Sequence, residues 1–133
     1  MKDIQVPISP GELLDKITIL RIKAARMTDA TKVANVRLEL ELLEATWRSS
    51  VAPDAQVSAD ERALQAVNER LWDIEDRIRD KEAEQAFDAQ FIELARSVYI
   101  ENDQRAAIKK RINVQLGSRI VEEKSYKPYA AVS

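Results

Sequence analysis

Five polar side chains with the chemistry to hold a small anion lie on or beside the apolar faces of predicted helices. They are Arg21, Glu75, Asn102, Arg105 and Lys109. At 100° per residue, Arg21 lies about 40° from Ile17, and Glu75 lies about 40° from Leu71. A buried guanidinium without a partner is costly, so Arg21 must meet a carboxylate or reach water.

Two arrangements would satisfy these side chains. In one, all five line a pocket between three helices, where the three cations bind a small anionic ligand. In the other, Arg21 pairs with Glu75 and fixes the helix register, Asn102 is a satisfied core amide, and Arg105 and Lys109 extend outward. We favour the second arrangement, because polar residues within helical bundles usually have this structural role.

The residue types exclude several other chemistries. The sequence contains no cysteine and no histidine, so the chain has no thiol nucleophile, imidazole base or thiolate metal site. With Gly 2, it has no glycine-rich phosphate loop. Any metal would need oxygen ligands alone, as Mg²⁺ accepts in all-helical nucleotide pyrophosphohydrolases. The acidic clusters are Glu39, Glu41 and Glu44 in one stretch, and Asp73, Glu75, Asp76 and Asp80 in another. Because Arg77, Arg79 and Lys81 lie among them, we interpret this face as solvated and predict no metal and no cofactor.

Charge and hydropathy narrow the class of partner. Lys+Arg 21 against Asp+Glu 23 gives a net charge of −2, so we predict no nucleic-acid partner. The sequence has no run of about 18 apolar residues, so we predict no membrane span. Its first ten residues lack the apolar core of a signal peptide. We therefore expect a cytoplasmic protein.

Four helices are predicted to position these side chains. Residues 3–8 alternate in polarity and suggest a short extended arm lying on the body. A capping box of Ser9 and Glu12, with Pro10 between them, begins the first helix, which runs to about residue 27 or 28. The second helix runs from about residues 29–31 to 48, and residues 49–58 form a loop.

The third and fourth helices complete the set. A second capping box, Ser58 with Glu61, begins a helix that ends at about residues 82–85. The last helix runs from about Ala89 to Leu116, with Asp88 as N-cap and Gly117 as a left-handed C-cap. The tail is expected to dock through Ile120, Val121 and Tyr126 and to fray after Pro128.

The second helix carries two apolar stripes. One consists of Val33, Val36, Leu40, Leu43 and Trp47, and the other of Ala34, Leu38, Leu42 and Ala45. Such a helix is either central in its own bundle or also faces a partner. The third helix adds a heptad-like seam of Leu64, Val67, Leu71, Ile74 and Ile78. Because this is more apolar surface than a monomer of 133 residues easily buries, we predict a homodimer.

The fold prediction is therefore an all-α antiparallel bundle of about four helices, with a short extended N-terminal arm and a C-terminal tail. It is one domain over residues 1–133, with an ordered core at about 6–126.

Three stretches carry a resemblance to a known family. They are VPISPGELLDKITILRIKA (6–24), LWDIEDRIRDKE (71–82) with FIELARSVYIENDQRAAIKKRIN (91–113), and LGSRIVEEKSY (116–126). They resemble a family of small bacterial proteins catalogued as the domain of unknown function numbered 6165. The resemblance implies a compact helical domain and supplies no activity, cofactor or catalytic residue.

A more distant likeness concerns the first helix alone. ELLDKITILRIKAARM is similar to the first helix of all-helical chorismate mutases, which use cations and a carboxamide between helices. Arg21, Arg105, Lys109 and Asn102 are residues of those types, but their order and spacing depart from the pattern of that family.

We predict a non-catalytic interaction or scaffold domain that acts as a homo-oligomer. One alternative is a binder of a small anionic metabolite. The other is an all-helical enzyme, either mutase-like or a Mg²⁺-dependent pyrophosphohydrolase.

Overall fold

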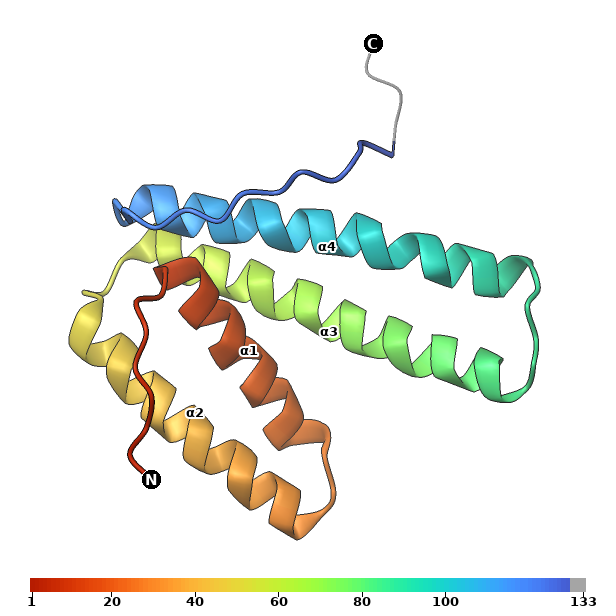
Figure 1. Ribbon diagram of the computed structural model, residues 1–133, viewed down its shortest axis with the longest axis horizontal. Helices are drawn as coiled ribbons and strands as arrows, with labels where there is room; N and C mark the ends of the chain where they lie inside the picture. The colour runs from red at the N-terminus through yellow and green to blue at the C-terminus, as the bar shows by residue number, and fades with distance from the viewer. Residues whose placement is uncertain (130–133) are drawn as a thin grey trace.

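A computed structural model describes residues 1–129 of the chain as a wholly α-helical domain (Figure 1). Its helices are α1 (Pro10–Arg26), α2 (Ala30–Ser50), α3 (Ala55–Ala83) and α4 (Ala89–Gln115). The predicted fold class and number of helices are confirmed.

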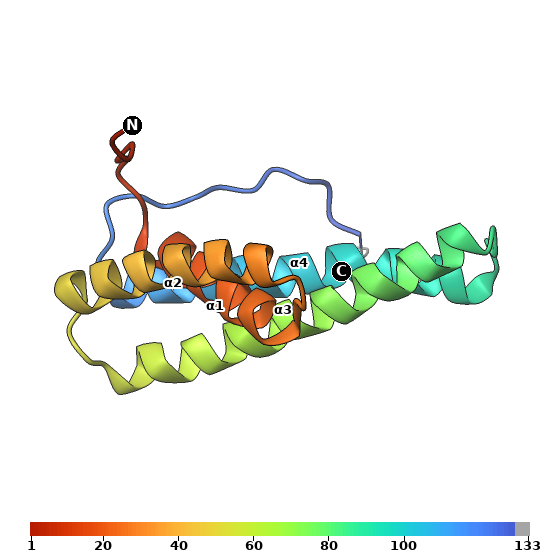
Figure 2. The same cartoon turned by 90° about the horizontal axis from the view of Figure 1, so that it is seen from below.

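Helix α1 is the centre of the arrangement, since it packs against each of the other three helices. Helices α3 and α4 form a long antiparallel hairpin whose closed end extends beyond α1 and α2 (Figures 1 and 2). The backbone of α2 approaches only that of α1. Helix α2 therefore lies at the edge of the bundle.

Side chains that accept hydrogen bonds from backbone amides begin the helices. Ser9 Oγ accepts from the amide of Glu12 at 3.2 Å, as the first capping box predicts. The predicted cap of the third helix at Ser58 is wrong. Asp54 is the N-cap and accepts from the amide of Val57 at 3.0 Å, so α3 begins about one turn earlier. This extra turn places Val57 in the core, which explains why the earlier start is preferred.

The core lies where α1 meets the first half of α3 and the second half of α4. Its buried members are Leu14, Val57, Leu64, Val67, Ile108 and Ile112. Helix α2 contributes no buried residue, although Trp47 packs against the edge of this cluster. The first half of α3 thus carries more of the core than its distal half.

The start of α1 lies very close to the end of α4 at Gly11. Its amide donates a 2.7 Å hydrogen bond to Asn113 Oδ1. A Cβ at residue 11 would lie 2.5 Å from the carbonyl oxygen of Lys109, well inside van der Waals contact. Gly11 therefore permits the packing that brings the polar residues of α1 and α4 together.

Neither terminal segment packs as predicted. Ile4 and Val6 are 79% and 69% exposed, and the N-terminal arm projects away from the helices (Figure 2). Within residues 1–129, no strand pairs with the arm and no apolar surface covers its apolar side chains.

The tail runs along α4, but Tyr126 is 83% exposed and Val121 is also exposed, so the predicted apolar docking is wrong for both. Glu122 and Lys124 hold the tail instead, through ion pairs with α4. Tyr129, just after the predicted fraying point, packs against Tyr99 with the two rings tilted and their centroids 5.1 Å apart. The rest of that prediction concerns residues 130–133, which lie outside the described residues.

Candidate functional site

Three of the five predicted site residues share one groove. Asn102, Arg105 and Lys109 lie on one face of α4 and line a groove of about 690 Å³ between that helix and the tail. The tail contributes Lys124 and Lys127 to the opposite wall. Arg21 and Glu75 do not line this groove. The predicted five-residue pocket is therefore wrong in composition, although its α4 part is assembled.

A buried carboxylate that the sequence reasoning missed anchors the wall of this groove. Asp15 of α1 is 1% exposed, and its Oδ2 accepts hydrogen bonds from Arg105 Nε at 3.2 Å and forms an ion pair with Nη2 at 3.0 Å. The amide of Asn68 donates to Asp15 Oδ1 and to Thr18 Oγ1, both at 2.9 Å. Arg105 therefore turns inward, contrary to the predicted outward orientation.

A signal for Asp15 was present in the sequence. Gly11 and Thr18 lie within about 60° of it on the helix, and small residues on one face mark a close helix contact. A carboxylate on such a face needs a cation from the neighbouring helix.

Lys109 connects α1, α4 and the tail. Its ammonium group pairs with Glu12, lies 3.2 Å from Glu122 Oε2, and lies 3.9 Å from Asp15 Oδ2. Desolvation by burial opposes the charged forms, but the hydrogen bond between Lys109 and Glu12 and the nearby opposite charges outweigh it. The pKa of Lys109 is therefore raised and the pKa of Glu12 is lowered from their ordinary values.

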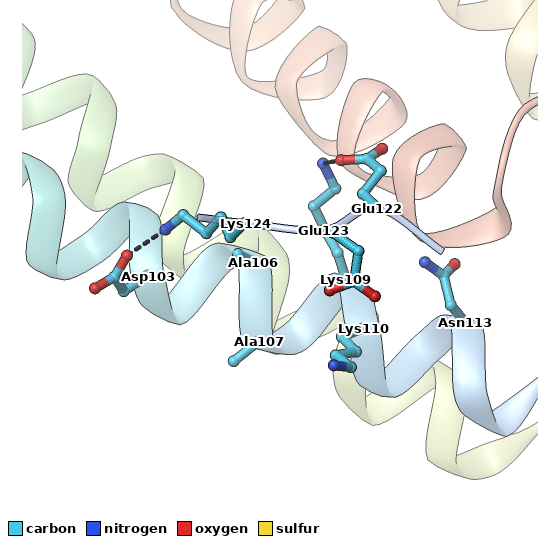
Figure 3. A pocket seen from close by; sticks show the side chains of 9 residues that line it. All are labelled: Asp103, Ala106, Ala107, Lys109, Lys110, Asn113, Glu122, Glu123 and Lys124. Atoms are coloured by element: carbon cyan, nitrogen blue, oxygen red, sulfur yellow. Dashed lines mark hydrogen bonds and ion pairs between the residues drawn. The ribbon is translucent and has the colours of Figure 1, made fainter. Parts of the chain in front are cut away.

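The tail crosses α4 at two ion pairs. Figure 3 shows Glu122 reaching Lys109 and Lys124 reaching Asp103, on the rim of a second hollow of about 320 Å³. This hollow shares both pairs with the larger groove. The cations that could attract an anion are thus largely neutralised by carboxylates of the chain itself.

Arg21 has a different partner from the predicted one. Its Nη1 lies 2.9 Å from Glu61 Oε2, and its Nε lies 3.6 Å from Glu44 Oε1. Glu75 is exposed and lies about 21 Å farther along α3 than Glu61. The predicted Arg21–Glu75 pair is wrong, because α1 crosses α3 near its first half.

Asn102 accepts from Arg105 Nη1 at 3.3 Å and is half-buried, so it orients that guanidinium from the groove side. Its side-chain oxygen has this partner, but Asn102 is not a core residue.

The acidic residues of α2 and α3 do not gather into one cluster. Asp73 pairs with Arg26, and Glu44 pairs with Arg21 and Arg48. Within residues 1–129, no three acidic side chains are placed to hold a metal ion together. Glu44 and Asp73 therefore serve as ion-pair partners, and not as metal ligands.

A second buried carboxylate lies at the junction of α3 and α4. Asp60 is buried, and its Oδ1 lies 3.1 Å from Arg111 Nη2, while its Oδ2 has no hydrogen-bond partner among the described residues. The pair joins the first half of α3 to the second half of α4.

An uncovered apolar face lies on α2. Its inner stripe packs half-buried against α1, whereas the outer face, defined here as Ala34, Leu38, Leu42 and Ala45, is exposed. Leu38 and Leu42 are 60% and 51% exposed. Since α2 lies at the edge of the bundle, the outer face has no cover within residues 1–129.

Comparison with known proteins gives one match. The model of the Family of unknown function (DUF6165) matches residues 4–133. The chain belongs to this family. The DUF6165 description states no activity, and no curated protein or solved structure matches the chain. Across residues 1–129, no helix of this DUF6165 member has the length and apolarity needed to cross a membrane.

Proposed function

We propose that this DUF6165 chain is a non-catalytic interaction or scaffold domain that acts as a homo-oligomer through the outer face of α2. One observation carries the proposal: α2 has 21 residues and two apolar stripes, yet none of its residues is buried. Covering Leu38 and Leu42 alone would contribute a few kcal/mol, at roughly 1.5–3 kcal/mol for each fully buried leucine.

The total surface supports the same proposal. The chain exposes 9477 Å², whereas a compact monomer of 15.1 kDa exposes about 7,100 Å². The excess of about 2,400 Å² is comparable to what one chain buries in a large obligate interface. The extended arm and tail contribute to this excess together with α2.

Sedimentation velocity tests the proposal. The native chain should sediment as a dimer at high micromolar concentration and dissociate on dilution, whereas Leu38→Glu/Leu42→Glu should sediment as a monomer with unchanged helical circular dichroism. Ile92→Glu/Val114→Glu is the matched control, since it adds the same charge at exposed apolar residues away from α2. A native chain that remains monomeric at high micromolar concentration would refute the proposal.

Binding of a small anion is a second candidate function, favoured by the meeting of Asn102, Arg105 and Lys109 in the groove beside Lys124 and Lys127. Inorganic phosphate or a small dicarboxylate should then raise the melting temperature relative to chloride at equal ionic strength. The rise should shrink in Lys124→Gln/Lys127→Gln. An unchanged melting temperature with both anions would rule out this function.

A further inference from the structure

Two oppositely charged side chains flank the outer face of α2 on the same side. Relative to Leu38, Arg37 lies about 100° and Glu41 about 60° around the helix in one direction, and Glu39 lies about 100° in the other. Arg37 and Glu41 are exposed, and neither forms an ion pair with another residue in 1–129. This flank therefore has unpaired charges of both signs beside an uncovered apolar face.

We infer that the occupant of the outer face is α2 of a second copy of the chain, in antiparallel orientation about a twofold axis near residue 40. The inference rests on the proposed function and names its partner and geometry. In such a pair, Leu38 lies opposite the partner's Leu42, and Ala34 lies opposite the partner's Ala45. Small residues at both ends of the face and leucines in its middle let the axes of the two helices approach to about 8–10 Å.

The flanking charges can form two ion pairs in this orientation. About a twofold axis perpendicular to the helices, each flank faces the same flank of the partner with its sequence reversed. Arg37 then lies opposite the partner's Glu41, and the symmetry repeats the pair. Antiparallel helices also place opposite ends of their dipoles together.

A parallel pair fits less well. In that orientation each flank faces the other flank of the partner. The partner's Glu39 would then lie near both Arg37 and Glu41, so each attraction is matched by a repulsion, and the helix dipoles would be aligned. The antiparallel pair brings Glu39 near the partner's Glu39 at the exposed rim, where like charges cost little, and Glu41 near the partner's Glu41 close to the axis, where the two Arg37–Glu41 pairs offset the repulsion. The number of attractive contacts is the same in the two orientations, so the opposed helix dipoles favour the antiparallel arrangement.

Charge reversal tests this geometry without altering the apolar face. Arg37→Glu and Glu41→Arg should each weaken self-association by roughly tenfold, because each places two like-charged pairs in the homodimer. An equimolar mixture of the two variants should form a heterodimer of at least native affinity, because both contacts between positions 37 and 41, and the contact between the two positions 41, then pair Glu with Arg. Arg79→Glu and Glu93→Arg, at exposed residues of α3 and α4, are controls that should change neither affinity.

The outcomes separate this inference from the proposed function. If Leu38→Glu/Leu42→Glu abolishes association but the charge variants have no effect, the face is right and the antiparallel register is wrong. If Glu41→Arg strengthens association, the parallel pair is correct and the inference is overturned. A monomeric native chain would overturn both the inference and the proposed function.

Discussion

Asp15 holds the polar interior of the molecule together. Its buried carboxylate accepts from Arg105 and Asn68 and lies near Lys109. Asp15→Ala leaves two donors without their acceptor, so the free energy of unfolding should fall by about 3–5 kcal/mol. Chemical denaturation measures the loss.

Asp73→Ala is the control for that measurement. It also removes one partner of an arginine, but the Arg26–Asp73 pair is exposed, and its loss should cost less than about 1 kcal/mol. Similar losses for the two variants would contradict the role assigned to Asp15.

The Glu12–Lys109 pair gives the protein a pH dependence of known sign. Because the pKa of Glu12 is lowered in the folded state, its stabilisation is present above about pH 4.3 and is lost as the pH falls below that value. The raised pKa of Lys109 makes its stabilisation complete below about pH 10.4 and lost above it.

Glu12→Gln should therefore be less stable than the native chain at pH 7, by up to about 1 kcal/mol for this half-buried carboxylate. The difference should narrow as the pH is lowered from 5 to 3, measured by urea unfolding at each pH. A difference that widens in acid would show that the sign is wrong.

For single residues, the sequence predicted which side chains share a helix face better than it predicted which side chains form ion pairs. Asn102, Arg105 and Lys109 share a helix face at spacings of three and four, so their proximity follows from helix geometry. The partner of Arg21 could not be predicted, because Glu44, Glu61 and Glu75 are equally able to pair, and the choice depends on where α1 crosses α3. Asp15 was not predicted, because apolar stripes do not show that a polar residue is buried.

Among the helices, the contact between α1 and α4 depends on a single glycine. Gly11→Ala improves helix propensity by up to about 1 kcal/mol, but its Cβ would meet the backbone of Lys109 and displace Asn113. Overpacking of this kind costs about 1–3 kcal/mol or more, so thermal unfolding should show a net loss of stability.

Gly117→Ala is the comparison for this prediction. No atom lies within 4 Å of its added Cβ, and only its φ of +66° opposes the change, at about 1 kcal/mol. A Gly11→Ala variant more stable than the native chain would show that α1 and α4 can separate freely.

Helix termini were predictable where a single side chain was suited to cap the helix. Ser9 and Asp88 cap α1 and α4 as the sequence predicts. Asp29 caps α2, within the predicted start at residues 29–31. At the start of α3, Asp54 and Ser58 are both suitable caps, and burial of Val57 decides between them. The N-terminal arm was predicted less well. Its residues alternate in polarity, but no neighbouring surface among residues 1–129 buries the apolar ones.

For the whole molecule, the main feature is that a two-sided apolar helix lies at the edge of the bundle. The sequence left open whether α2 is central or faces a partner, because both positions give the same stripes. Only the tertiary arrangement shows that the outer face is uncovered, and this is the basis for proposing a homodimer.

Site-directed cross-linking tests that proposal most directly. The native sequence has no cysteine, so the only thiols are those introduced by substitution. Under mild oxidation, a mixture of Ala34→Cys and Ala45→Cys chains should form a covalent dimer containing one of each, while either variant alone should remain uncross-linked, since its thiols lie about 16 Å apart along the helix axis. Absence of the mixed dimer, or an equal yield from each variant alone, would contradict antiparallel association of two chains through the outer face of α2.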